Sequence, residues 1–170
     1  MKILIVVAPE GYQDIEYNTL KEILQKAGYE IVTTSTAEIA KGSLGGKTKV
    51  DLLLDKVNVE DYIAIVFIGG PGSHVYFNHK PVLKLAQDFY NAGKITAAIC
   101  AAPSILANAG ILNGKTATSF EGQIQNLKDK GAAITNNPIE QDGIIITANG
   151  PSAAKAFGDK IVDTLKNFNK

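Results

Sequence analysis

The hydrophobic positions of this chain form short apolar runs, separated by longer segments of helical periodicity. Residues 2–8, 62–68 and 95–99 read KILIVVA, YIAIVFI and ITAAI, without the polar alternation of a half-exposed strand. Such runs are typical of central strands that are covered on both faces, and residues 30–34 predict a further strand. The pattern therefore predicts a sheet with a buried centre.

Helices are predicted between and after these strands. Residues 14–27, 81–92 and 101–109 are each followed directly by a glycine, the residue that favours the left-handed cap at the end of a helix. Near the C-terminus, Ser152 is placed to cap a last helix. The apolar stripe of that helix comprises Ala154, Phe157, Ile161, Leu165 and Phe168.

Shorter elements are predicted elsewhere. Residues 42–55 indicate a small antiparallel addition at the edge of the sheet, and residues 115–119, 123–130 and 132–135 predict a strand, a helix and a strand. The Asp142-Gly143 pair is a strong tight-turn signal and predicts a hairpin.

The alternation of strands and helices predicts an α/β fold with a mostly parallel central sheet and helices on both faces. We expect a flavodoxin-like three-layer sandwich that spans residues 1–170 as a single domain.

Charge and composition exclude several classes of protein. The 17 basic residues balance the 17 acidic ones and are all lysines, so the excess charge and arginine forks of a nucleic-acid-binding surface are missing. The apolar runs are too short to span a membrane, and acidic residues follow the N-terminus too closely for a signal peptide. A cytoplasmic protein is expected. The single cysteine, Cys100, allows no internal disulfide and no cysteine-based zinc site.

Cys100 lies where the strand at 95–99 meets the following helix, in the sequence A-I-C-A-A. The small residues Ala98 and Ala102 permit the strained turn of a nucleophile elbow, which projects a reactive side chain above the sheet. A helix N-terminus also favours the thiolate, so Cys100 is expected to titrate well below the ~8.5 of a free thiol. The alternative, a buried and inert cysteine, is less consistent with this junction.

Other candidate residues follow neighbouring strands, at the edge where parallel sheets bind ligands. Gly69-Gly70 is either a plain turn or one half of an oxyanion hole, whose other half is the N–H of Ala101. Three acids follow the first strand, namely Glu10, Asp14 and Glu16, and spacing does not choose between them. His74 and His79 are the candidates for an imidazole base, and no motif places either of them.

The motifs A-I-C-A-A-P at 98–103, I-G-G at 68–70 and D-I-E at 14–16 together resemble the ThiJ/PfpI superfamily, and the likeness covers nearly the whole chain. This superfamily includes the parkinsonism-associated oxidative-stress protein and bacterial stress chaperones. The resemblance implies that Cys100 is the nucleophile and that Glu16 is a protonated acid hydrogen-bonded to the thiolate. It also implies that Gly70 and Ala101 are the oxyanion donors and that the protein forms a homodimer.

Two departures from the family pattern matter. The peptidase branch has a histidine directly after the cysteine, where this chain has Ala101, so peptidase activity is not expected. The stress-protein branch often has a further histidine where Ser119 stands here. His74 is the residue that could replace either imidazole, because its loop follows Gly69-Gly70.

Two functions are consistent with the resemblance. In the first, Cys100 and Glu16 convert a small 2-oxoaldehyde such as methylglyoxal into a 2-hydroxy acid, in the manner of a glyoxalase or deglycase and without metal, glutathione or other cofactor. In the second, the protein is a non-enzymatic stress sensor or chaperone that responds to oxidation of Cys100. Intracellular cysteine peptidase activity is a third, weaker alternative.

Overall fold

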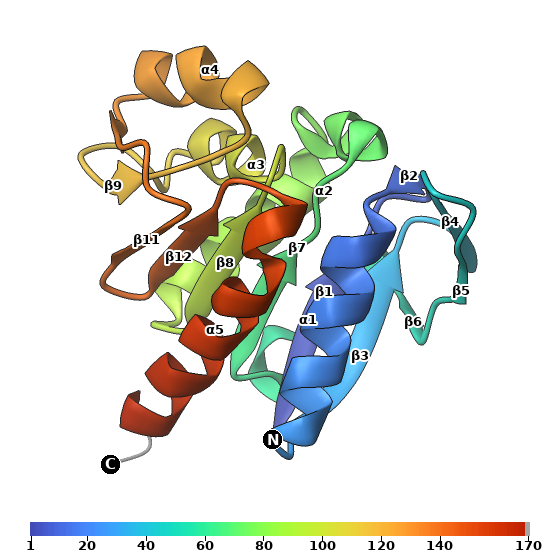
Figure 1. The fold of residues 1–170 in the computed structure, drawn as a ribbon. Helices are drawn as coiled ribbons and strands as arrows, with labels where there is room; N and C mark the ends of the chain where they lie inside the picture. Colours follow the sequence, from blue (N-terminus) through green and yellow to red (C-terminus); the bar gives the residue numbers. More distant parts are fainter. Residues whose placement is uncertain (169–170) are drawn as a thin grey trace.

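A mostly parallel sheet of seven strands forms the centre of the computed structural model, which describes residues 1–168 (Figure 1). In spatial order its strands are β11 (Ile139–Asp142), β12 (Ile145–Ala148), β8 (Ile95–Ile99), β7 (Ala64–Phe67), β1 (Lys2–Val6), β3 (Glu30–Ser35) and β6 (Leu52–Leu53). Neighbouring strands run parallel except for the β11–β12 hairpin. The predicted fold class is confirmed.

Helices cover both faces of this sheet. Figure 1 shows α1 (Asp14–Lys26) and α5 (Ala154–Phe168) side by side on one face, while α2 (Lys80–Asn91) and α3 (Pro103–Asn108) lie behind the sheet. Residues 3–6 of β1 and all of β7 are at most 1% exposed. Two-sided burial explains why these strands show no polar alternation in sequence.

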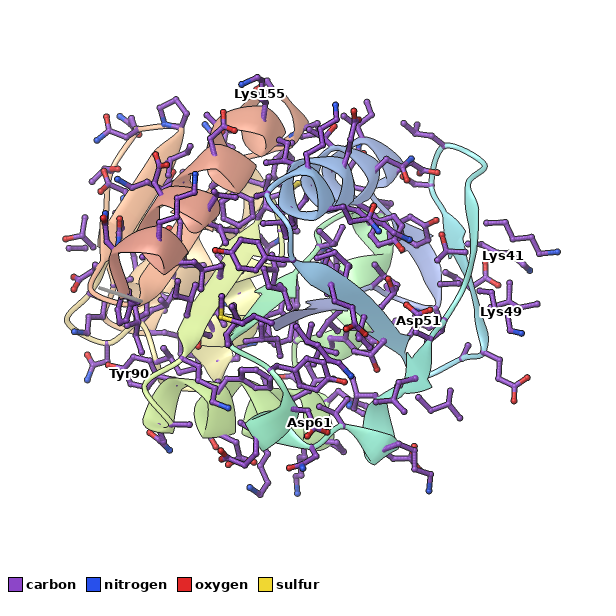
Figure 2. The ribbon with its side chains drawn as sticks, turned by 90° about the horizontal axis from the view of Figure 1, so that it is seen from below. Lys41, Lys49, Asp51, Asp61, Tyr90 and Lys155 are labelled. Atoms are coloured by element: carbon purple, nitrogen blue, oxygen red, sulfur yellow. The ribbon has the colours of Figure 1, made fainter. Side chains whose placement is uncertain are left out.

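A separate sheet of three strands stands beside the carboxyl end of the main sheet, at the upper right of Figure 1. It consists of β2 (Glu10–Tyr12), β4 (Ile39–Gly42) and β5 (Lys47–Lys49). In Figure 2, the side chains of Lys41 and Lys49 project outward from it. The prediction for residues 42–55 is therefore wrong in its placement: the antiparallel β4–β5 pair is not part of the main sheet, and β6 joins that sheet in parallel register.

The carboxylate of Asp14 explains this displacement. Its two oxygens accept hydrogen bonds from the N–H groups of Leu44 and Gly46 at 2.7 Å each. These bonds hold the β4–β5 turn against the start of α1, away from the edge of the main sheet.

The predicted strand, helix and strand after residue 114 are present in shorter form, as β9 (Thr116–Ala117), α4 (Ile124–Asp129) and β10 (Ala133–Ile134). The two strands pair only with each other, in a second small sheet. The predicted hairpin is also confirmed: β11 and β12 are antiparallel, and Gly143 in the turn has a φ of 61°.

The starts of two helices and one residue of a predicted apolar stripe differ from the predictions. The helix after Cys100 starts at Pro103, because residues 100–102 form a turn. Ser152 lies inside a 3₁₀ turn spanning Pro151–Ala153 that precedes α5, and it does not cap this helix. Phe168 is 56% exposed and falls outside the buried stripe of α5, since it lies in the last turn of the described chain. Among residues 1–168, no helix is long and apolar enough to cross a membrane.

Candidate active site

Cys100 follows β8 directly and adopts a left-handed backbone conformation with a φ of 64°. Every other residue with positive φ in the described chain is a glycine. Two backbone hydrogen bonds hold the turn: the Cys100 N–H donates to Ala148 O at 2.8 Å, and Cys100 O accepts from the Phe120 N–H at 2.7 Å. The left-handed region costs an ordinary residue roughly 1–2 kcal/mol, so the surrounding fold maintains a strained elbow.

Two glycines after β7 allow a second loop to approach this elbow. A Cβ on Gly69 would lie 2.6 Å from the Cβ of Cys100, so no larger residue fits without displacing the cysteine. Gly70 has a φ of 101°, and a Cβ there would lie 2.6 Å from Gln13 N. The backbone N–H groups of Gly70 and Ala101 both interact with the thiol and lower its pKa. The two predicted oxyanion donors therefore both lie beside the sulfur of Cys100.

Glu16, in the first turn of α1, is fully buried beside the elbow. Its Oε2 accepts a hydrogen bond from the Gly69 N–H at 3.0 Å. Its Oε1 has no hydrogen-bond partner of regular geometry among residues 1–168, although the Cys100 thiol is close enough to interact with the carboxyl. Burial raises the pKa of Glu16 from 4.5 to about 7, against the opposing effects of the thiol and the Gly69 N–H.

The expectation that Cys100 ionises unusually easily is wrong for the resting site. Burial, and then the neighbouring charge of Glu16, raise the pKa of the thiol to about 12. The sequence argument relied on the helix N-terminus, but α3 has only six residues and begins three positions after Cys100. Because each group affects the ionisation of the other, the thiol and the carboxyl titrate as a pair that can share a proton.

The structure distinguishes the three acids between which sequence spacing did not choose. Glu16 lies against Cys100, whereas Asp14 is bound to the β4–β5 turn. Glu10 is exposed and forms an ion pair with Lys41 at 3.1 Å. Only one of these three carboxylates is therefore in a position to exchange a proton with the thiol.

The two histidines and Ser119 also separate. His74 is exposed at the rim of the Cys100 pocket, with its ring 4.5 Å from that of Phe77. His79 precedes α2 and packs against Tyr76, 5.9 Å between ring centroids, and it does not line the pocket. Ser119 does not line that pocket either, and its hydroxyl donates to the carbonyl of Phe120. Within the described chain, no imidazole lies at hydrogen-bond distance from Cys100. The histidines that family members have at the positions of Ala101 and Ser119 are therefore not replaced.

Above the thiol lies a pocket of about 370 Å³, a size suited to a small molecule. Its lining residues are Gln13, Gly70, Pro71, His74, Cys100, Ala101, Phe120 and Pro151. Sequence reasoning missed Gln13, Phe120 and Pro151, because only the fold brings these three separate loops to one edge of the sheet. Pro151 could have been suspected from the sequence, because it follows the predicted strand that ends at residue 148.

No group of three or more His, Cys, Asp or Glu side chains within residues 1–168 could hold a metal ion.

A strained cysteine turn above a parallel sheet is the arrangement of α/β proteins with a nucleophile elbow. Within that class, the chain belongs to the DJ-1/PfpI family, which it matches over residues 1–164.

Named relatives and solved structures agree with this assignment. The chain is 36% identical to an uncharacterised protein of Methanocaldococcus jannaschii, with 99% of this chain and 84% of that protein covered. It is 32% identical to a deglycase of Pyrococcus horikoshii, with 98% and 100% covered. The crystal structure of a ThiJ/PfpI domain protein from Brachyspira murdochii superposes with a TM-score of 0.96 at 34% identity, covering 98% and 96% of the two chains.

Proposed function

We propose that this protein converts small 2-oxoaldehydes into 2-hydroxy acids through Cys100 and Glu16, without a cofactor. The observation that carries the proposal is the contact between the strained thiol and a buried carboxyl that is short of hydrogen bonds. Two relatives of 32% identity, from Pyrococcus horikoshii and Pyrococcus furiosus, are named deglycases, which supports carbonyl chemistry in this part of the family.

The first step uses the proton that the pair shares. Around neutral pH, Glu16 accepts the thiol proton while the sulfur of Cys100 bonds to the aldehyde carbon. The carbonyl π bond opens, and the N–H groups of Gly70 and Ala101 stabilise the negative oxygen. Glu16 then returns the proton to that oxygen and leaves a neutral hemithioacetal.

The second step moves hydrogen between the two carbonyl carbons. The carboxylate of Glu16 removes the hydrogen from C1 and delivers it to C2, while the hydroxyl proton moves from the C1 oxygen to the C2 oxygen. C1 is oxidised as C2 is reduced, so the product is a thioester of the 2-hydroxy acid and no external oxidant is needed. Water then cleaves the bond between C1 and sulfur, which releases the acid and restores the thiol.

Peptides are poor substrates for such a site. Cleavage of an amide requires a proton donor for the leaving amine, a role worth roughly 10²–10⁴ in rate. Ala101 offers no donor of this kind, and His74 is exposed with its ring against Phe77. An aldehyde has no leaving group at this step, so the thiol and carboxyl suffice.

The test is lactate formation from methylglyoxal in phosphate buffer free of amines and added thiols. We expect the wild-type protein to produce lactate, Cys100→Ser to produce none, and Glu16→Gln to be strongly impaired. Glu10→Gln is the matched control, because it removes a nearby acid that lies in β2 and faces solvent.

Equal lactate from wild type and Cys100→Ser would refute the proposal. If no lactate forms, and intact mass spectrometry shows that peroxide adds oxygen to Cys100, the stress-sensor function would be favoured over the enzymatic one.

A further inference from the structure

A second hollow adjoins the Cys100 pocket and has the opposite chemistry. It has a volume of about 420 Å³, and Phe120 lines both spaces. Six of its eight lining residues carry a hydroxyl, amide or carboxyl group, whereas prolines, alanine and phenylalanine make up much of the wall around Cys100. A substrate that reaches past Phe120 would therefore pass from apolar to polar surroundings.

Asn149 links this hollow to the elbow. It follows β12 as Cys100 follows β8, and the preceding residues Ala148 and Ile99 are partners in the parallel register. The Cys100 N–H donates to the carbonyl of Ala148 at 2.8 Å, so the two residues are neighbours at the carboxyl edge of the sheet. Ligands of open parallel sheets bind at this edge.

The amide of Asn149 is also uncommitted. It is half-buried, yet it makes no side-chain hydrogen bond with any group in residues 1–168, and the same is true of the more exposed Asn136. By contrast, the hydroxyl of Thr135 donates to Glu140 at 2.7 Å, and that of Ser119 donates to the carbonyl of Phe120. Each free amide offers both donors and an acceptor, which matches hydroxyl groups that also donate and accept.

Charge narrows the choice of ligand. Within residues 1–168, Glu121 is the charged residue that lines the hollow, and no lysine or histidine lines it. An anionic tail such as a sugar phosphate would meet no positive partner there and would be repelled by the carboxylate. A neutral, hydroxyl-bearing chain would avoid this repulsion and could form hydrogen bonds with the hydroxyl and amide groups of the lining.

We propose that this hollow binds the hydroxylated tail of a carbonyl substrate and that Asn149, assisted by Asn136, determines the preference for it. The substrate class is a sugar-derived 2-oxoaldehyde whose C2 carries several hydroxyl-bearing carbons. This inference rests on the proposed function, because it takes Cys100 as the reacting group. It adds that methylglyoxal is a minimal substrate, which fills the Cys100 pocket and leaves the adjoining hollow empty.

The first experiment needs no turnover. Cys100 is the single thiol of the chain, so intact mass spectrometry follows its alkylation by iodoacetamide and by N-iodoacetylglucosamine. In each reaction the sulfur bonds to carbon and iodide leaves. We expect the sugar-bearing reagent to show a saturable rate in the wild-type protein, and Asn149→Ala to slow that reagent about fivefold to tenfold while the iodoacetamide rate stays unchanged.

Two further variants complete the design. Asn136→Ala should slow the sugar-bearing reagent less than Asn149→Ala does, and it replaces Asn149→Ala if that variant does not fold. Asn167→Ala is the matched control, because this residue lies near the end of α5 beside Met1, at the other end of the sheet. An equal slowing of both reagents, or of neither, would overturn the subsite.

The second experiment measures turnover of 3-deoxyglucosone against that of methylglyoxal. Asn149→Ala should lower kcat/KM for the hydroxylated substrate about tenfold and leave that for methylglyoxal unchanged. If no variant forms a 2-hydroxy acid but the alkylation preference is present, the proposed reaction is wrong and the subsite stands. If methylglyoxal is converted but the alkylation preference is absent, the subsite is wrong and the proposed reaction stands.

Discussion

Asp14 and Glu16 lie two residues apart in the first turn of α1, both are buried, and the protein uses them differently. The carboxylate of Asp14 accepts hydrogen bonds from two backbone N–H groups at 2.7 Å each, so both of its oxygens have donors. The carboxyl of Glu16 accepts one backbone hydrogen bond at 3.0 Å, and its other buried oxygen has no hydrogen-bond partner of regular geometry among residues 1–168. The satisfied acid fixes a loop, whereas the unsatisfied acid has its pKa raised to about 7 and can exchange a proton with Cys100.

Close backbone approach does not explain this difference, because glycines lie against both carboxylates. A Cβ on Gly42 or Gly46 would lie 2.1 Å from Oδ1 of Asp14, and one on Gly69 would lie 3.0 Å from Oε2 of Glu16. The two carboxyl groups differ in their N–H donors. Burial raises the pKa of Glu16, and its single backbone donor at 3.0 Å offsets only part of that effect.

The largest expected effect separates the two acids by activity. Glu16→Gln keeps the size of the side chain and removes its proton transfer, so lactate formation from methylglyoxal should fall by about 10² or more. Asp14→Asn should leave that rate within about a factor of three, because its contacts lie in the β4–β5 turn. Steady-state kinetics of both variants test this expectation. Similar losses of activity in the two variants would mean that Glu16, like Asp14, has only a structural role.

The next effect concerns stability and pH. The folded-state pKa of Glu16, about 7, exceeds its ordinary value of 4.5, so the folded protein binds this proton more tightly than the unfolded chain does. Its stabilising contribution is complete below about pH 4.5 and is lost as the pH rises through about 7, a change of about 3 kcal/mol.

Urea unfolding between pH 5 and pH 8 measures this contribution. Glu16→Gln cannot ionise, so its stability relative to wild type should increase across that range by most of the stated amount. Asp14→Asn provides the control and should show no such increase. A constant difference between wild type and Glu16→Gln would contradict the raised pKa.

A smaller loss should follow from Asp14→Asn itself. The amide retains one acceptor oxygen and turns an NH₂ group toward the second backbone donor, so one buried hydrogen bond is lost. We expect the free energy of unfolding to decrease by about 1–3 kcal/mol at neutral pH. Amide hydrogen exchange should show the loss at Leu44 and Gly46, and protection unchanged at both sites would contradict the role given to Asp14.

The main sheet could be predicted from sequence because its signals are local. The apolar runs of β1, β7 and β8, and the Asp142-Gly143 turn, each depend on residues within a few positions of one another. The small sheets could not be placed in this way. The position of β4 and β5 depends on the contact between Asp14 and the turn at Leu44, thirty residues away.

The candidate site shows the same limit. The junction around Cys100 is a local motif, so the elbow could be recognised from A-I-C-A-A. The environment of the thiol depends on burial and on Glu16, which lies 84 positions earlier in the chain. Sequence reasoning therefore found the candidate nucleophile and predicted its pKa in the wrong direction. It also missed Asn149, whose position beside Cys100 follows from the register of β12 against β8.

The smallest effect compares the turns that serve the two acids. Both need a left-handed residue: the turn bound by Asp14 uses Gly45, with a φ of 95°, and the elbow beside Glu16 uses Cys100, with a φ of 64°. An added Cβ on Gly45 would touch nothing within 4 Å, so Gly45→Ala should cost only the backbone strain, about 1 kcal/mol. The same preference for glycine is expected in the elbow, where Cys100→Gly should be more stable than Cys100→Ala by about 1 kcal/mol. Urea unfolding of the three variants measures both differences, and an alanine at position 100 as stable as glycine would show that the elbow carries no strain for the fold to maintain.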